Sequence, residues 1–442
     1  MPENIRPSRI RVLVFSSLGH FINDGMGFFI PVIAAILASQ HGVSPLLVTA
    51  VLTLYYLTSA GCGILVGLAA DSLGDRGTIM AVGILVLALG LFAFAAALAA
   101  PAGLARSGVS LLAAVLAGAG SSFYHPVGGS LLQLTFSDRA RGRALGVNGS
   151  FGSLGRALYP SIFFVVAALS ISTGSTVLLF ACVGVVASLA IAAGLRPGAI
   201  GAGSGNNVQR REVLVASGLS PDGNEKASAP PGPDGRQGPA SSRPLLSLLD
   251  RSVITLMAIA FLRSMAFIGI VSWMPIYLAT QKHAGLSSQL GITVTVLYAG
   301  GILGQPLFGL LADSLDKRVV LSANSLGAAG SILLYLSTAG PLAMLFLLLF
   351  GFFTFAAFPL LLSLVSDYVP REASATGNAL VWGIGSTGGQ ALGPVAVSLL
   401  TLGAYHRLGF AFAVLAVVAA ATVVGAPLLR KTARHTAVAR FG

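Results

Sequence analysis

The sequence predicts an all-α membrane protein with twelve transmembrane helices in two pseudo-symmetric bundles of six, and three observations predict it. Of the 442 residues, 55% are hydrophobic and only 9% are charged, whereas a soluble domain carries about a quarter charged residues. The uncharged runs reach about 20 residues, the length that crosses a bilayer as a helix. A charged turn between two such runs occurs twice, 242 residues apart.

The repeated turn is the strongest evidence for two similar halves. The first copy is Gly67-Leu-Ala-Ala-Asp71-Ser-Leu-Gly-Asp-Arg76, and the second is Gly309-Leu-Leu-Ala-Asp313-Ser-Leu-Asp-Lys-Arg318. A tight turn between membrane helices gathers Gly, Asp and Arg in any case. Agreement at seven positions in register favours an internal repeat instead, as found in many transporters.

The apolar runs give the individual elements. They are continuous, which favours helices over the alternating strands of a membrane barrel. In the first half we expect spans at 12–37, 46–70, 78–100, 110–133, 144–168 and 176–194. In the second half we expect spans at 253–279, 291–312, 319–338, 342–364, 374–400 and 409–429.

Residues 196–250 separate the halves. This segment is rich in Gly, Pro, Ser and Asn and has few aromatic residues, a composition that is typical of disorder. We therefore expect two domains, residues 1–195 and 251–442, joined by a disordered cytoplasmic linker. A simple tether is the plainer interpretation of the linker, and a regulatory role is the alternative.

The net charge of +12 predicts topology once the cations are placed along the chain. Three lie in the outer loops (Arg106, Lys282 and Arg407) and two within spans, which leaves 21 of the 26 Lys and Arg residues on one side. The positive-inside rule then places both termini in the cytoplasm. The basic excess therefore reflects a multi-pass protein of the cytoplasmic membrane, and no nucleic-acid partner is expected.

Other function classes lack their sequence signals. Cys62 and Cys182 both fall within spans, and the six His residues have no zinc-ligand spacing along the chain. No Walker motif is present, so ATP-driven transport is not expected. We expect no metal, no cofactor and a monomer in the lipid bilayer.

Ionisable residues within the spans give the candidate site. Asp24 is the only acidic residue inside any expected span, and Arg156 and Arg263 are the only cations. Counted by helical rise from the cytoplasmic membrane edge, these three residues and His125 lie roughly 18–20 Å deep. Charges at this depth are costly and usually face an interior cavity. We therefore predict a site near the midplane, between the two halves.

The residue types suggest roles. Guanidinium groups suit carboxylate, phosphate or phosphonate, so we expect Arg156 and Arg263 to bind one anionic group of the substrate. Asp24 would carry a proton, together with His20, which lies one helical turn before it, or with His125, which we also count as a substrate-binding candidate. The alternatives are a structural ion pair between Asp24 and one arginine, and an ordinary core role for His125.

Tyr56 and Tyr298 occupy equivalent positions in the two halves, 242 residues apart. Aromatic side chains with a polar tip can line a substrate cavity, so we count both as substrate-binding candidates. Ordinary packing between helices is the equal alternative for both of them.

The twelve spans, the long central loop and the doubled turn together resemble the major facilitator superfamily over the whole chain. The resemblance implies that the turn residues latch the cytoplasmic gate and do not bind substrate. Charges at helix ends make such a latch physically reasonable. The residues concerned are Gly67, Asp71, Arg76, Gly309, Asp313 and Arg318.

Two shorter stretches resemble the fosmidomycin-resistance-type transporters of that superfamily. They are Ser17-Leu-Gly-His20-Phe-Ile-Asn23-Asp24 and Gly118-Ala-Gly-Ser-Ser-Phe-Tyr-His125-Pro126. The resemblance implies export of a phosphonate or drug, with Asn23 among the substrate contacts. The chain departs from the pattern in its fifth span, where Arg156 stands in place of a small residue.

These observations predict a proton-coupled secondary transporter that moves a small organic anion or drug by alternating access. An efflux antiporter is the form that the resemblance implies, and an uptake symporter for a small carboxylate is the alternative. Two other classes are a membrane enzyme that uses His20 and Asp24 as acid and base, and a non-transporting receptor. The first lacks a nucleophile or metal set, so no enzyme is expected.

Overall fold

The computed structural model describes residues 6–73, 75–136, 138–169, 172–196, 249–282, 287–369, 377 and 379–431. These residues form helices joined by short turns and contain no strand. The first half consists of α1 (Arg6–His41), α2 (Pro45–Leu73), α3 (Arg76–Ala99), α4 (Leu104–Ser121), α5 (Tyr124–Thr135), α6 (Asp138–Ala168) and α7 (Thr173–Gly194). The second half consists of α9 (Arg251–Thr280), α10 (Ser288–Ser314), α11 (Lys317–Ser337), α12 (Gly340–Phe355), α13 (Ala357–Tyr368), η3 (Ala379–Thr387), α15 (Gly388–Thr401), η4 (Tyr405–Arg407), α16 (Leu408–Ala421) and η5 (Thr422–Leu428).

Each predicted span corresponds to one helix or to consecutive helices. Within the described residues, ten helical stretches are long and apolar enough to cross a membrane. The other two predicted spans, 342–364 and 374–400, are divided into α12 with α13 and η3 with α15. Each piece is therefore shorter than a full crossing. The expected linker over 196–250 lies almost wholly outside the described residues.

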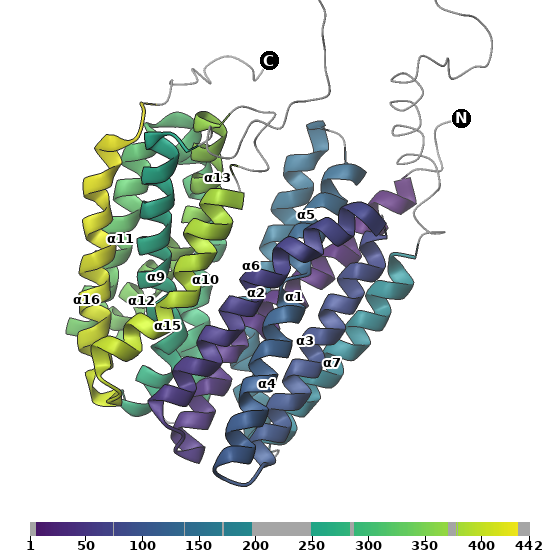
Figure 1. Ribbon diagram of the computed structural model, residues 1–442, viewed down its shortest axis with the longest axis vertical. Coiled ribbons are helices and arrows are strands. Elements are labelled where there is room, and N and C mark those ends of the chain that lie inside the picture. Colours follow the sequence, from purple (N-terminus) through teal and green to yellow (C-terminus); the bar gives the residue numbers. More distant parts are fainter. Residues whose placement is uncertain are drawn as a thin grey trace, which may run out of the picture.

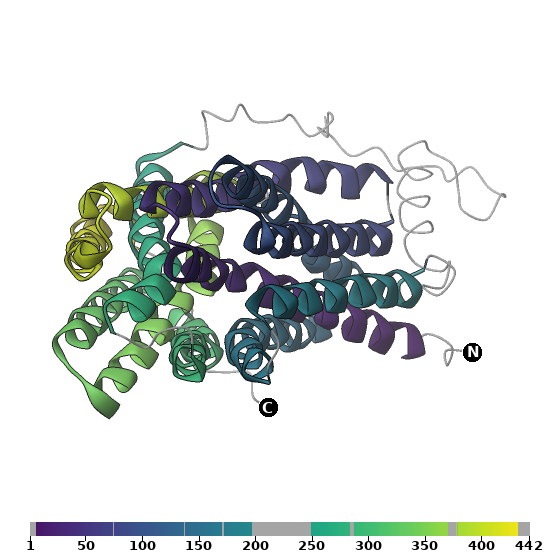
Figure 2. The same ribbon diagram turned by 90° about the horizontal axis from the view of Figure 1, so that it is seen from below.

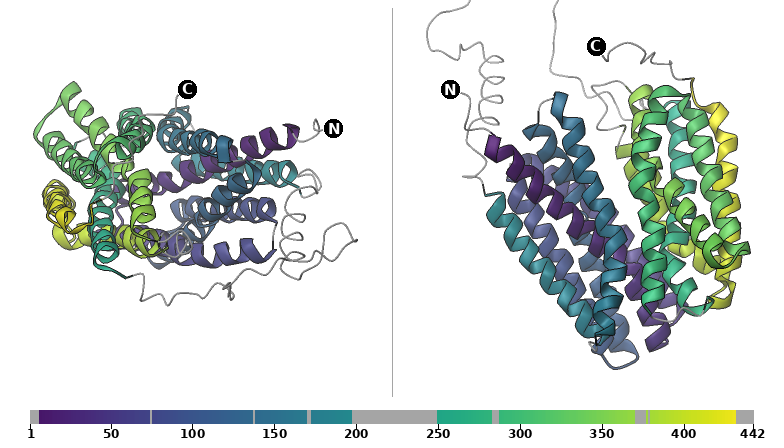
Figure 3. Two further views of the ribbon diagram at one scale, coloured as in Figure 1. Left: turned by 90° about the horizontal axis from the view of Figure 1, so that it is seen from above. Right: turned by 180° about the vertical axis from the view of Figure 1, so that it is seen from behind.

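The helices form two bundles, one from each half of the chain (Figure 1). Viewed end on, the helices of the two halves occupy separate sides of the molecule (Figure 2). The bundles diverge toward the end where α1 begins and η5 ends, and they approach each other at the opposite end (Figure 3). Contacts of α1 with α9, α2 with α15 and α6 with α10 join them.

Two tyrosine contacts join the bundles in a pseudo-symmetric way. The Tyr56 hydroxyl on α2 lies 2.9 Å from the Ser272 hydroxyl on α9. In the other direction, the Tyr298 hydroxyl on α10 donates to the Phe28 carbonyl on α1 at 3.3 Å. The internal repeat therefore reappears as a pair of related contacts between the halves.

Two further cross-bundle hydrogen bonds lie toward the end where the bundles meet. The Ser161 hydroxyl on α6 is 2.7 Å from the Thr295 hydroxyl on α10. The Tyr405 hydroxyl donates to the Val43 carbonyl, in the turn between α1 and α2, at 2.9 Å. This end of the molecule is therefore held closed by direct contacts between the halves.

Proline breaks two of the helices at equivalent places. The ring of Pro126 would clash with the carbonyl of Ser122 in a continuous helix, and the chain leaves the helix between α4 and α5 at this point. Pro359 has the same relation to Phe355, where α12 ends. The first break places His125 in the opening turn of α5, next to α1.

Glycines bring α6 unusually close to α1. A Cβ atom at Gly155 would lie 2.1 Å from the Phe21 carbonyl oxygen, and one at Gly152 would lie 2.3 Å from Nε2 of His20. Only glycine permits such an approach. The close contact sets Asn148 and Arg156, which flank these glycines on α6, beside the polar face of α1.

Candidate functional site

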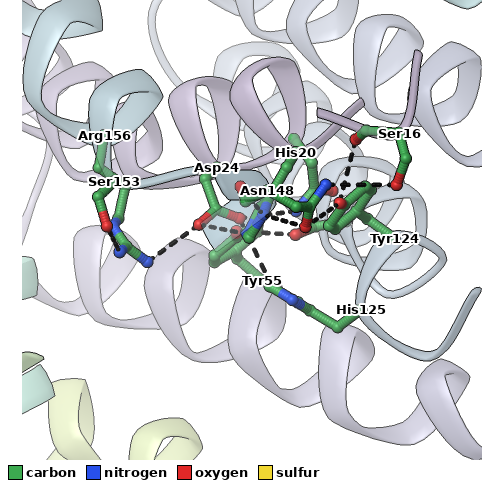
Figure 4. Close-up of polar contacts among 11 residues, drawn as sticks. Ser16, His20, Asp24, Tyr55, Tyr124, His125, Asn148, Ser153 and Arg156 are labelled. Atoms are coloured by element: carbon green, nitrogen blue, oxygen red, sulfur yellow. Dashed lines mark hydrogen bonds and ion pairs between the residues drawn. The ribbon is translucent and has the colours of Figure 1, made fainter. Parts of the chain in front are cut away.

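The centre of the site is Asp24 on α1, whose side chain is 1% exposed. Nη1 of Arg156 on α6 lies 2.9 Å from its Oδ2, and Nε2 of His20 lies 3.3 Å from the same oxygen. Nε2 of His125 on α5 lies 3.5 Å from Oδ1. The structure therefore gathers four of the predicted ionisable residues into one cluster (Figure 4).

The hydrogen bonding of His20 fixes its tautomer. Its Nδ1 lies 2.8 Å from the main-chain carbonyl of Asn148, which can only accept a hydrogen bond. Nδ1 therefore carries a proton, and Nε2 points at a carboxylate oxygen of Asp24. Two lone pairs would repel each other there, so the contact is favourable only with a cation between them, such as a proton on Nε2. The imidazole also stacks on Tyr124, with ring centroids 4.5 Å apart.

Arg156 connects the cluster to the other bundle. Besides Asp24, its guanidinium donates to the Ser153 hydroxyl at 2.8 Å. It lies between the rings of Phe28 on α1 and Phe355 on α12, 5.1 and 5.3 Å from their centroids. Such cation–π contacts stabilise a desolvated guanidinium. Nε of Arg156 is buried without a hydrogen-bond partner in the described structure, so one donor of this guanidinium is unused.

The cluster is open on one side. The His125 side chain is 63% exposed, while that of Asp24, which it faces, is 1% exposed. His125 lies beside the α4–α5 break, in the first turn of α5. A proton or a ligand can therefore approach Asp24 past His125.

Arg263 makes its hydrogen bonds within the second bundle, so its binding of one anion together with Arg156 stays a prediction. Its residue exposure is 4%, and its guanidinium donates to the Asn324 amide oxygen on α11 and to the Phe353 carbonyl. The break after α12 removes the main-chain N–H that would bond the Phe353 carbonyl in a continuous helix, and Arg263 donates to this carbonyl instead. Helical counting along α9 gives a depth for Arg263 but no direction around the helix axis.

The three remaining substrate-binding candidates are buried. Asn23 donates its amide to Oδ1 of Asp24 at 3.1 Å, so it supports the carboxylate directly. Tyr56 and Tyr298 direct their hydroxyls across the bundle interface, as described above. In this conformation the two tyrosines join the bundles and do not face open space.

The predicted gate residues lie at the ends of the helices. Nε of Arg76 donates to the Ser130 hydroxyl on α5 at 3.1 Å. Arg318 forms an ion pair with Asp316 at 2.7 Å, and this hydrogen-bonded guanidinium holds the pKa of the carboxyl below its usual value. The side chains of the two motif aspartates fall outside the described structure. The remaining motif positions lie on α2 (Gly67, Asp71) and α10 (Gly309, Asp313).

Several residues of the site were not identified from the sequence. Asn148, Tyr124 and Ser153 hold His20 and Arg156, and Phe355 contacts Arg156 from the second bundle. They are neutral side chains in apolar helices and carry no charge signal. Of these four residues, only Asn148 could have been identified from the sequence, because an amide side chain within a predicted span needs a polar partner.

Comparisons with known proteins agree with this architecture. The sequence pattern described as Major Facilitator Superfamily matches residues 13–394, and again residues 287–440. A provisionally named metabolite transport protein of Haemophilus influenzae is 29% identical over 157 residues, which is 35% of this chain and only 38% of that protein's length.

Solved structures show the same fold. A bacterial homologue of the human lysosomal transporter Spinster, inward-facing and occupied, has a TM-score of 0.66 at 17% identity, covering 96% of both chains. The inward-open xylose transporter of E. coli has a TM-score of 0.68 at 11% identity, covering 96% of this chain and 97% of that one. At these identities the likeness concerns the fold, while the sequence pattern covers most of the chain. The chain therefore belongs to the major facilitator superfamily and is a multi-pass membrane protein.

Proposed function

We propose that this transporter is proton-coupled and moves a small organic anion by alternating access. Arg156 binds the anionic group of the substrate, and Asp24 with His20 holds the proton. One observation carries the proposal: Asp24 is paired with a guanidinium and an imidazole at the same time, deep within the first bundle. A carboxylate in this position can either bind a proton or pair with the arginine that would bind the anion.

The link is competition for Arg156. As long as Asp24 is ionised, its carboxylate occupies Nη1 of Arg156. A carboxylate or phosphonate of the substrate needs the same guanidinium. Uptake of one further proton by the cluster, which places a proton on Oδ2 of Asp24 beside Nε2 of His20, 3.3 Å away, neutralises Asp24 and frees Arg156. Proton binding and anion binding therefore favour each other, and linkage makes the effect reciprocal.

Because proton binding and anion binding promote each other, one form of coupling is favoured. Ligands that promote each other's binding cross together, so the geometry supports proton–anion symport, the alternative raised by the sequence. An antiporter of the fosmidomycin-resistance type would need the proton and the substrate to exclude each other. That would suit a cationic drug bound at Asp24, whereas Arg156 suits an anion.

Arg156 also connects the site to the second bundle, which moves relative to the first in alternating access. Its guanidinium contacts Phe355 of the second bundle, so neutralising it with an anion changes a contact between the halves. Rocking of two bundles about a central site is the usual form of alternating access. We assign the end where the bundles diverge to the cytoplasm of the cell, in line with the distribution of cations, and we take the protein to work as a monomer.

Counterflow of a labelled small carboxylate or phosphonate in liposomes tests the transport function, because neither an enzyme nor a receptor exchanges substrate across a membrane. Asp24→Asn should abolish accumulation driven by a pH gradient and keep counterflow, which needs only the loaded carrier to reorient. Asp250→Asn is a matched control, since Asp250 caps α9 outside the cluster. Full pH-driven accumulation by Asp24→Asn would remove Asp24 from the coupling mechanism.

A further inference from the structure

We propose that His20, Asp24 and His125 also form a binding site for a divalent transition-metal ion. Within the described part of the chain, these residues bring three donor atoms within 4.8 Å of one another. The proposal goes beyond proton-coupled transport, which needs no metal. Two of the residues come from one turn of α1 and the third comes from the opening turn of α5.

The donor distances are close to those of a tetrahedral site. Metal–ligand bonds of about 2.0–2.1 Å place tetrahedral ligand atoms about 3.3–3.4 Å apart. Nε2 of His20 lies 3.3 Å from Oδ2 of Asp24, and Nε2 of His125 lies 3.5 Å from the other oxygen, Oδ1. One donor atom from each residue lies within 4.8 Å of the others, so bringing both histidines to one carboxylate oxygen needs shifts of up to about 1.4 Å. The exposed His125 side chain is free to make such a shift.

Hydrogen bonds from neighbouring groups already hold His20 and Asp24 in an orientation suited to metal binding. A metal-binding histidine usually donates its second ring N–H to a main-chain carbonyl or a carboxylate. Nδ1 of His20 does so with the Asn148 carbonyl at 2.8 Å, which leaves the lone pair of Nε2 directed at Asp24. The Tyr124 hydroxyl donates to Oδ1 of Asn148 at 2.9 Å, and the Asn23 amide donates to Asp24.

The donor set selects the kind of ion. Two imidazole nitrogens and one carboxylate suit Zn²⁺, Co²⁺, Ni²⁺ or Cu²⁺, whereas Mg²⁺ and Ca²⁺ prefer oxygen ligands. Three protein ligands leave a fourth position open, on the side where His125 is exposed. Arg156, 2.9 Å from Asp24, adds a positive charge beside the ion. The open position therefore favours an anion as the fourth ligand.

The metal and the proton require the same lone pair of His20. A bound ion therefore displaces the proton, and its affinity falls as the pH is lowered. If the proposed coupling is correct, the ion also blocks pH-driven transport. This last consequence rests on the proposed function, whereas metal binding itself does not.

Titration of the purified, untagged protein with Co²⁺ alone tests the site, since tetrahedral Co²⁺ gives strong visible absorption bands and hydrated Co²⁺ does not. We expect one equivalent of tetrahedral Co²⁺, displaced by Zn²⁺ and bound more weakly at lower pH. His125→Gln and His20→Gln should each weaken binding at least about tenfold, because loss of even an outer-shell partner costs about 10–100-fold. His406→Gln, in the exposed η4 segment, is the matched control.

The absence of tetrahedral bands at millimolar Co²⁺ would overturn the proposal. So would bands that persist in the His20→Gln/His125→Gln double variant, because the ion would then lie elsewhere. Failure of Co²⁺ binding with normal pH-driven transport removes the metal site alone. Co²⁺ binding by a protein that shows no pH-driven accumulation in the absence of metal would remove the proposed function and leave the metal site.

Discussion

At the scale of single residues, the central feature is a buried carboxylate with nitrogen partners from three helices. A buried ion pair is weak evidence for stability, because desolvation offsets most of the attraction, while removing one partner costs about 3–5 kcal/mol. Asp24 is 1% exposed and pairs with Arg156 and His20. Charges within membrane helices are usually functional, and here the shared carboxylate provides a switch between an anion and a proton.

A double-mutant experiment separates this switch from a purely structural pair. Arg156→Gln should weaken anion binding by about 2–5 kcal/mol, and Arg156→Lys should restore part of it, since it keeps the charge but loses the bidentate geometry. Adding Asp24→Asn to Arg156→Gln should raise the melting temperature by removing a buried charge that has lost its guanidinium partner. The ligand-induced melting shift should not return. Its return in the double variant would mean that Arg156 serves only as the counter-ion of Asp24.

At the scale of elements, the site depends on how closely α6 packs on α1. A Cβ atom at Gly152 would lie 2.3 Å from Nε2 of His20, whereas Gly149, one turn earlier, has nothing within 4 Å. Gly152→Ala should therefore displace the His20 ring and reduce proton-driven transport. Gly149→Ala should leave transport unchanged and favour the helix by about 0.5–1 kcal/mol. Equal transport by the two variants, measured at equal expression, would show that the α1–α6 contact does not position His20.

The sequence predicted the elements well because membrane helices carry a strong hydropathy signal. It also placed His20 and Asp24 on one face of α1, since their spacing is one helical turn. The partners of Arg263, Asn324 and the Phe353 carbonyl, were not predictable, because depth counting says nothing about direction around a helix axis. The contacts of Asn148 with His20 and of Phe355 with Arg156 depend on tertiary packing, which the sequence pattern does not show. The sequence placed Asp24 and His125 at one depth, but it did not suggest that His20, Asp24 and His125 could bind one ion, because His125 comes from another helix and the spacing along the chain is not that of a metal site.

At the scale of the whole molecule, the two bundles touch at one end and diverge at the other. The side-chain oxygens of Ser161 and Thr295 are 2.7 Å apart across the interface, near the closed end. A disulfide between cysteines at these positions should hold this end shut. Native Cys62 and Cys182 would first be replaced by serine.

The crosslinked protein should lose counterflow, keep anion binding from the open end, and recover transport after reduction. Each single cysteine variant serves as a control for the substitution itself. Full transport by the crosslinked protein would contradict a mechanism in which the bundles separate at this end.

The most direct test of the central claim is the pH dependence of anion binding in wild type and Asp24→Asn. If protonation of Asp24 frees Arg156, wild-type affinity should rise by up to about tenfold for each pH unit lowered, as one proton is taken up with the anion. Asp24→Asn should bind with the high affinity at every pH, because its neutral amide never competes for Arg156. Calorimetric titration between pH 5 and 8, with a ligand whose charge is constant over that range, measures both. A pH-independent affinity in wild type, or the same slope in Asp24→Asn, would contradict the account.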